Sequence, residues 1–116
     1  MKTMITETPA QKLEWTETLL GGKDVPLKEA EKAVQALGDG WRLPTVTELQ
    51  SLVDRSRSDP AIDTAKFPDT KSDWYWTSTP CAWNKNARWV VDFSYGVVSD
   101  FNVSYTACVR ACRASQ

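Results

Sequence analysis

The chain has 116 residues and a formal net charge of −1, so it can bury one small hydrophobic core and offers no excess of positive charge to nucleic acid or an anionic membrane. It contains no histidine, the commonest general base and metal ligand, which argues against zinc sites, Ser-His-Asp triads and Cys-His dyads. No stretch is apolar enough to cross a bilayer or to act as a signal peptide, so we expect a cytoplasmic protein with no membrane contact.

The first third of the sequence predicts a strand followed by a helix. We expect residues 1–12 to form an N-terminal tail and residues 13–116 to form a single domain. Residues 13–20 predict the first strand. Pro26 is typical of a helix start, and a Gly-Asp-Gly stretch at 38–40 is typical of a helix end. Between them, four apolar residues share one helical face: Leu27, Ala30, Val34 and Leu37.

A second helix is predicted over residues 46–57. Thr45 is a good N-cap and Glu48 stands three residues later, so the two predict a capping box. One buried stripe follows at helical spacing: Val46, Leu49, Leu52 and Val53. We expect Leu49 and Leu52 to be buried together with Trp41. The Ser-Asp-Pro stretch at 58–60 ends the helix.

The second half of the sequence predicts a long loop and then antiparallel strands. Residues 59–73 are polar and contain two prolines, which indicates a loop. Strands are predicted at 74–78, 88–93 and 105–113, with turns at 84–86 and 94–96. A strand, two helices, a loop and several strands together predict an α+β domain.

Six stretches carry recognisable motifs, and they occur in this order: W-R-L-P-T-V-T-E-L at 41–49, L-V-D-R-S-R at 52–57, D-P-A-I-D at 59–63 with F-P at 67–68, W-Y-W-T-S-T at 74–79, R-W-V-V-D-F at 88–93 with Y-G at 95–96, and V-R with a later arginine at 109–113. Together they resemble the Lcl C-terminal domain family, found at the C-termini of collagen-like adhesins and in many short bacterial and phage proteins. The resemblance implies a C-type-lectin-like fold. In that fold two helices flank an antiparallel sheet, the terminal strands pair, and a long loop region carries the binding surface. The motif arginines Arg42, Arg110 and Arg113 are expected to pair with Glu48 or Asp54 rather than with a ligand.

No calcium or other metal site is expected. Sugar-binding C-type lectins hold calcium with Glu-Pro-Asn or Gln-Pro-Asp and with Trp-Asn-Asp tripeptides, and neither type is present. The stretch Trp83-Asn84-Lys85 comes closest, but a lysine stands where calcium needs an acidic ligand. The remaining carboxylates of this half are scattered: Asp69, Asp73, Asp92 and Asp100.

The three cysteines, Cys81, Cys108 and Cys112, are expected to be reduced and buried as small apolar residues. Formylglycine-generating enzymes have a related fold and bind copper through a cysteine pair in a late strand, but with one more residue between the two. Residues four apart in a strand lie roughly 13 Å apart, too far for a disulfide, which needs Cα atoms within about 7 Å, or for a shared metal. A copper oxidase is therefore only the third alternative.

The candidate binding surface lies between the scaffold motifs. Trp41, Trp74, Trp76 and Trp89 fall inside the motifs, so we assign them to the core. Aromatic residues between the motifs alternate with amides and hydroxyls, a composition typical of antibody-like binding surfaces, although some of these rings could equally fill the sheet. The candidates are Trp83, Asn84, Lys85, Asn86, Tyr95, Asp100, Phe101, Asn102 and Tyr105.

The sequence therefore predicts a non-enzymatic, protein-binding module without a cofactor. Neither a nucleophile with a partner base nor a phosphate-binding loop is recognisable. Family distribution favours a phage or mobile-element accessory protein that inhibits a host enzyme or defence complex. The alternative is an adhesin domain that binds glycans or glycosaminoglycans, although such adhesins carry collagen-like repeats.

Overall fold

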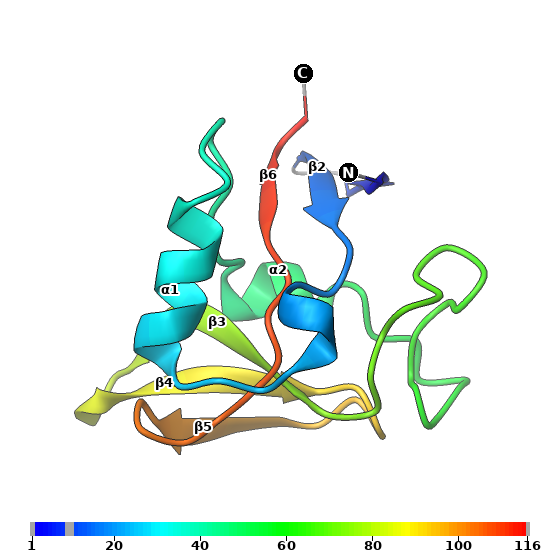
Figure 1. Cartoon of the computed structure of the whole chain (residues 1–116). Coiled ribbons are helices and arrows are strands. Elements are labelled where there is room, and N and C mark those ends of the chain that lie inside the picture. The colour runs from blue at the N-terminus through cyan, green and yellow to red at the C-terminus, as the bar shows by residue number, and fades with distance from the viewer. Residues whose placement is uncertain (1, 9–10, 116) are drawn as a thin grey trace.

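The computed structural model describes residues 2–8 and 11–115. Two antiparallel three-stranded sheets, ordered β1-β2-β6 and β3-β4-β5, make up the fold together with two short helices (Figure 1). The α+β prediction is confirmed at this level. The elements in chain order are β1 (Thr3–Glu7), β2 (Lys12–Thr16), the 3₁₀ turn η1 (Leu20–Gly22), α1 (Leu27–Gln35), α2 (Val46–Gln50), β3 (Trp74–Cys81), β4 (Asn84–Asp92), β5 (Val98–Asn102) and β6 (Cys112–Ala114).

The larger sheet, β3-β4-β5, has apolar side chains on both faces. Neighbouring residues of a strand point to opposite faces. Tyr75 of β3 belongs to the cluster that holds Leu49 of α2, whereas Trp76 belongs to the cluster that holds Ala30 and Val34 of α1. The Trp-Tyr-Trp run at the start of β3 is therefore hydrophobic without a break because each face of the sheet has its own core.

The two helices start where the sequence predicts, but α2 is shorter than predicted. Pro26 precedes α1, and the Thr45–Glu48 capping box is present at the start of α2. The chain leaves the helix after Gln50 instead of continuing to residue 57. The reason is non-local: the amide of Asp54 donates to the carbonyl of Ala61 at 2.8 Å rather than to a carbonyl one helical turn before it.

The apolar stripe that begins in α2 packs in a different hydrophobic cluster from Trp41. Leu49 and Leu52 lie in the α2 cluster, and Trp41 lies in the α1 cluster. The expectation that all three pack together was therefore wrong. The Arg113 guanidinium covers the Trp41 ring, 4.2 Å from its centroid.

The predicted first strand pairs with the last strand, as expected, because Leu13 of β2 pairs with Ala114 of β6. The region predicted to be a tail, residues 1–12, contributes β1, which pairs along its whole length with β2. The predicted first strand also ends early, at Thr16, and η1 follows it. The small sheet thus extends further toward the N-terminus than the predicted domain boundary at residue 13.

The late part of the chain differs from the predicted strand at 105–113. Only β6 forms there, preceded by single bridges that join Ala107 to Val25 and Cys108 to Tyr75. This segment crosses from the large sheet to the small one, so it cannot pair continuously with either. β5 was not predicted, and the turn predicted at 84–86 lies inside β4, because the chain reverses at residues 82–83.

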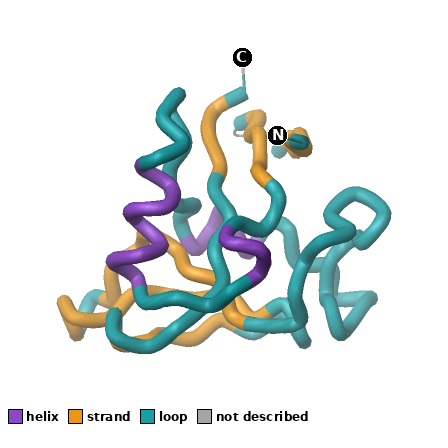
Figure 2. Tube along the Cα trace, in the orientation of Figure 1, coloured by secondary structure: helices purple, strands orange, loops and turns teal. Residues whose placement is uncertain are grey.

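Residues 51–73, between α2 and β3, contain no helix or strand and form a lobe of turns beside the large sheet (Figure 2). This confirms the predicted loop at 59–73. No helix in the described ranges 2–8 and 11–115 is long and apolar enough to cross a membrane.

Candidate functional site

Six of the nine candidate binding residues gather at one end of the large sheet. Ala87 of β4 pairs with Asn102 of β5, and the amide of Val103 donates to the carbonyl of Asn86 at 2.8 Å. The β3–β4 turn and the segment after β5 therefore lie side by side. We call residues 83–86 and 102–105 the hairpin end. Its candidate residues are Trp83, Asn84, Lys85, Asn86, Asn102 and Tyr105.

Two aromatic rings of the hairpin end are exposed, and each rests on a ring beneath it. The Trp83 side chain is 70 % exposed and meets Trp89 edge-to-face at 5.5 Å between centroids. Tyr105 is 59 % exposed and meets Phe101 at 5.6 Å. Such aromatic pairs stabilise each other beyond simple burial, so the exposed rings are held in place before any partner arrives.

The two supporting rings lie on opposite faces of the sheet. In the β4–β5 register Phe101 stands opposite Arg88, whereas Trp89 stands opposite Asp100. Since Arg88 and Trp89 are adjacent in β4, their side chains point to opposite faces. Trp83 and Tyr105 therefore flank the hairpin end from two sides rather than forming one flat platform.

The polar residues of the hairpin end shape its turns. The Asn84 side-chain oxygen accepts from the amide of Asn86 at 3.0 Å, and the Asn102 side-chain oxygen accepts from the amide of Ser104 at 3.0 Å. The side-chain nitrogens of Asn84 and Asn102 have no partner in the part of the chain that the structure describes. Each asparagine therefore fixes a turn with its oxygen and keeps two donors for a ligand.

The other three candidates lie elsewhere. Tyr95, 69 % exposed, sits in the β4–β5 turn at the opposite end of the sheet. Phe101 is half-buried, with Trp74 at 5.1 Å and Trp76 at 6.2 Å between ring centroids, so it is chiefly a support. Asp100 lies within β5. Sequence reasoning missed Trp89 as a support, because it was assigned mainly to the core, although it is half-buried and contacts the Trp83 ring.

The carboxylates considered for calcium are dispersed among different partners. Asp69 accepts from the backbone amide of Thr18 and from Arg110. Asp92 accepts from the amide of Ser94 at 2.8 Å in the β4–β5 turn. In residues 2–8 and 11–115 no three His, Cys, Asp or Glu side chains are grouped as metal ligands.

Cys108 and Cys112 have separate surroundings. The Cys108 Sγ lies 3.8 Å from a carboxylate oxygen of Asp73, and the Cys112 Sγ lies 3.8 Å from one of Glu48. Burial, opposed at Cys112 by the Arg42 guanidinium, raises the pKa of each thiol to about 12. At neutral pH both are therefore thiols rather than the reactive thiolates that nucleophilic or redox chemistry requires.

All three cysteines are free and buried, and we expect thiol titration to reflect this. In denaturant without reductant, three thiols should react with a chromogenic disulfide. The folded protein at pH 8 should react far more slowly, because Cys108 and Cys112 are protonated and all three side chains are buried. A count of one in denaturant would mean that a disulfide forms in solution.

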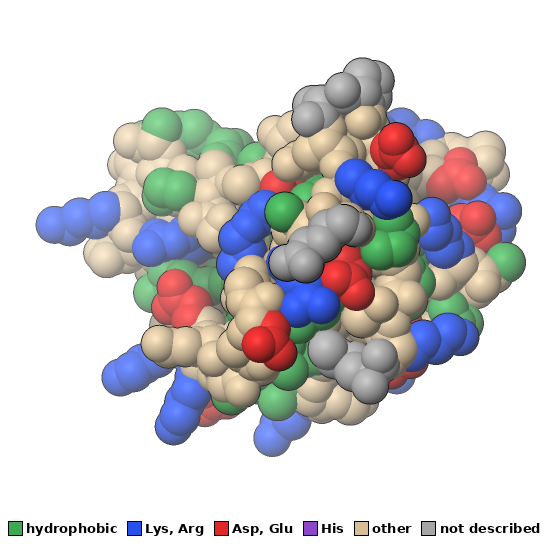
Figure 3. All heavy atoms as spheres, turned by 90° about the horizontal axis from the view of Figure 1, so that it is seen from above, with side chains coloured by type: hydrophobic (Ala, Val, Ile, Leu, Met, Phe, Trp, Pro, Cys, Tyr) green, Lys and Arg blue, Asp and Glu red, His purple; other side chains and the backbone are tan. Residues whose placement is uncertain are grey.

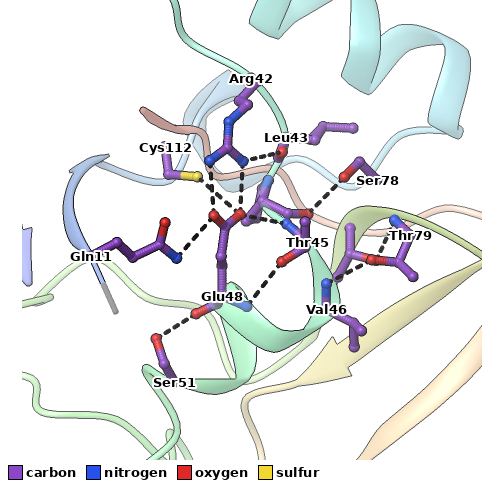
Figure 4. A network of polar contacts seen from close by, with 12 residues as sticks. Gln11, Arg42, Leu43, Thr45, Val46, Glu48, Ser51, Ser78, Thr79 and Cys112 are labelled. Carbon is purple, nitrogen blue, oxygen red and sulfur yellow. Dashed lines mark hydrogen bonds and ion pairs between the residues drawn. The ribbon is translucent and has the colours of Figure 1, made fainter. Parts of the chain in front are cut away.

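The motif arginines bind within the scaffold. Arg42 donates to both carboxylate oxygens of Glu48, at 2.7 and 2.8 Å, as the sequence predicted (Figure 4). Arg110 and Arg113 have other partners than the predicted Glu48 and Asp54. Arg110 lies 3.4 Å from Asp69, and Arg113 donates to Glu14 at 2.8 Å. None of the three faces the hairpin end.

The face that carries the small sheet has mixed charge, with basic and acidic side chains interspersed (Figure 3). A hollow of about 730 Å³ opens beside this sheet and is lined by Ile5, Glu14, Asp39, Arg113 and Ser115. The ion pair of Glu14 and Arg113 forms part of its wall. These two charges compensate each other and leave the Asp39 carboxylate as the remaining charge of the lining. The hairpin end, with its two exposed rings, remains the better candidate.

A comparison with family models finds that the model described as Lcl C-terminal domain matches residues 4–113. The match covers nearly the whole chain, so the protein belongs to this family. The resemblance expected from the motifs is thereby confirmed, and the match includes most of β1. A search of curated proteins finds no match.

Proposed function

We propose that this member of the Lcl C-terminal domain family is a non-enzymatic binding module with a C-type-lectin-like fold, and that its hairpin end binds a protein. The pairing of β2 with the last strand β6, the two helices and the lobe at 51–73 support this assignment of the fold. The observation that carries the function is the pair of exposed rings, Trp83 and Tyr105, each fixed by a ring beneath it.

The form of the hairpin end favours a protein over a glycan. Trp and Tyr dominate the binding energy of protein interfaces when they enter desolvated pockets. Here they stand on two sides of one protruding turn, so a concave partner surface can cover both at once. The free amide donors of Asn84 and Asn102 and the exposed Lys85 ammonium supply the polar rim of such an interface. A sugar stacked on Trp83 alone would leave Tyr105 unused.

If the hairpin end inserts into a cleft of its protein partner, that cleft is blocked for as long as the complex lasts. We infer that the module acts by such blockage, as an inhibitor of a host enzyme or defence complex. The occurrence of short stand-alone members of this family in phages motivates this inference. The glycan-binding alternative requires only that Trp83 stack on a sugar ring, and the experiment below separates the two.

Truncation of the exposed rings is expected to weaken binding without unfolding the domain. Trp83→Ala and Tyr105→Ala should each reduce affinity for a partner captured from host lysate by about 2 kcal/mol, roughly thirtyfold, measured by calorimetry. Tyr95→Ala is the matched control, since it removes an equally exposed ring from the other end of the sheet. It should leave affinity unchanged, and all three melting temperatures should stay close to that of the native protein.

Two results would contradict the proposal. Equal weakening by Tyr95→Ala would mean that the hairpin end is not the contact surface. Displacement of the partner by free glycans or by EDTA would instead restore the lectin alternative.

A further inference from the structure

β5 is an edge strand of the large sheet, and the N–H and C=O groups of successive residues point alternately toward β4 and away from it. In antiparallel pairs, residues alternate between those that exchange hydrogen bonds and those that do not. Two bonds fix the phase: the amide of Asp92 donates to the carbonyl of Val97 at 2.7 Å, and the amide of Val103 donates to that of Asn86 at 2.8 Å. With the β4–β5 register, Ser99 and Phe101 bond to β4. The backbone groups of the alternate residues, Val98, Asp100 and Asn102, point away from it.

These outward groups are unpaired within the described part of the chain. The amide and carbonyl of Val98, both groups of Asp100 and the amide of Asn102 bond to no other described residue. The carbonyl of Asn102 is already occupied, because it accepts from the amide of Tyr105 at 2.9 Å. Five donors and acceptors at every second residue form the pattern that a further strand recognises. In Figure 1, β5 lies at the lower border of the molecule.

The side chain of Asp100 decides which kind of strand fits. It is half-buried, and its carboxylate has no ion pair or hydrogen bond among the described residues. If two copies of the chain paired antiparallel about this position, Asp100 would face Asp100, and like charges directly opposite each other destabilise a sheet. A lysine or arginine at the opposing position would gain an ion pair instead. The edge therefore disfavours a second copy and suits a strand with a basic residue.

Exposed apolar side chains stand at both ends of this edge. Val97 precedes β5, and Tyr105 follows it. An added strand that covered Val98 to Asn102 would therefore contact apolar surface beyond each end of the ladder. One of these residues, Tyr105, also belongs to the hairpin end, so the two surfaces are continuous.

We propose that the β5 edge binds an extended segment of the protein partner as an added strand, with a basic side chain opposite Asp100. This inference rests on the proposed function in one respect, namely that the partner is a protein. The main-chain hydrogen bonds supply affinity, and Asp100 selects the charge of the incoming strand. The hairpin end and the edge can be tested separately, because Trp83 belongs only to the hairpin end and Asp100 only to the edge.

The probe is the synthetic peptide acetyl-TVTKTVT-amide, compared with acetyl-TVTETVT-amide, in which glutamate replaces the lysine. Titration into the isotopically labelled protein should shift the amide resonances of Val98, Asp100 and Asn102 and slow their hydrogen exchange. The amides of Ser99 and Phe101 should change less, since they already bond to β4. The lysine peptide should bind about fivefold more tightly than the glutamate peptide, the size of a cross-strand charge pair.

The variant Asp100→Lys should reverse the preference between the two peptides, and this result would identify Asp100 as the selecting group. Trp83→Ala should bind the lysine peptide as the native protein does, even if it loses the protein partner. The proposal is overturned if millimolar lysine peptide leaves the Val98 and Asp100 amides unchanged, or if the native protein binds both peptides equally. Loss of the hairpin-end function alone would leave the peptide result intact, so the two failures are distinguishable.

Discussion

Arg110→Ala is expected to lower the free energy of unfolding by about 3–5 kcal/mol, the usual result of removing one partner from a buried charged network. The Arg110 side chain is 1 % exposed. Its guanidinium donates to the carbonyl of Thr16 at 2.8 Å and to the hydroxyl of Thr70 at 2.9 Å, and it lies 5.0 Å over the ring of Phe67. These contacts join the small sheet to the lobe at 51–73, so removing the side chain leaves the buried carbonyl of Thr16 and the half-buried hydroxyl of Thr70 without this donor.

Urea unfolding followed by tryptophan fluorescence measures this change. Arg110→Lys is the matched control, because it retains the charge but cannot reach both acceptors with a planar group. We expect it to recover less than half of the loss. A loss below about 1 kcal/mol for Arg110→Ala would show that the network contributes little net stability, as some buried ion pairs do.

Glu48→Gln is expected to destabilise the domain by about 2–3 kcal/mol at pH 7 and to remove a pH dependence. Hydrogen bonds from Arg42, together with that from the Thr45 amide, outweigh burial and lower the pKa of Glu48 from 4.5 to about 2. The carboxylate is 8 % exposed, whereas Arg42 is 45 % exposed, so solvent screens part of the gain. The side-chain amide that Glu48→Gln introduces has a single acceptor oxygen, so it cannot pair with both guanidinium donors as the carboxylate does.

The sign of the pH effect follows from the lowered pKa. A carboxylate with a lower pKa in the folded state stabilises that state fully above its unfolded pKa, and the gain is lost as pH falls through the folded pKa. The native protein should therefore lose this stability between about pH 4.5 and pH 2, while Glu48→Gln should show a flatter profile over the same range. Urea midpoints at pH 7, 4 and 2.5 test this. Parallel profiles for the two proteins would contradict the role of Glu48.

Features that depend on neighbouring residues could be predicted from the sequence. The capping box needs only Thr45 and Glu48, and the buried face of α1 needs only the spacing of its apolar residues. The early end of α2 could not be predicted, because it depends on a bond between Asp54 and the distant Ala61. β1 and β5 were missed because each is an edge strand of five residues without a clear alternation of buried and exposed positions.

The candidate site was predicted in composition but not in shape. Residues 83–86 and 102–105 were chosen because they lie between the scaffold motifs, and the structure brings them together. Tyr95 was chosen with them, yet β4 runs from the hairpin end to the turn that holds Tyr95, so the two lie a full strand apart. Because β5 was not predicted from the sequence, there was no indication that a strand separates Tyr95 from Tyr105 and places them at opposite ends of the sheet.

The small sheet determines how the domain can be tethered. β1 and β6 both pair with β2, so the first and last strands belong to the same small sheet, in the upper part of Figure 1, whereas the β3–β4 hairpin points to the lower left. A bead, a sensor surface or a fused protein joined at either terminus therefore stands remote from Trp83. A captured layer of the domain therefore displays the hairpin end away from the support in both cases.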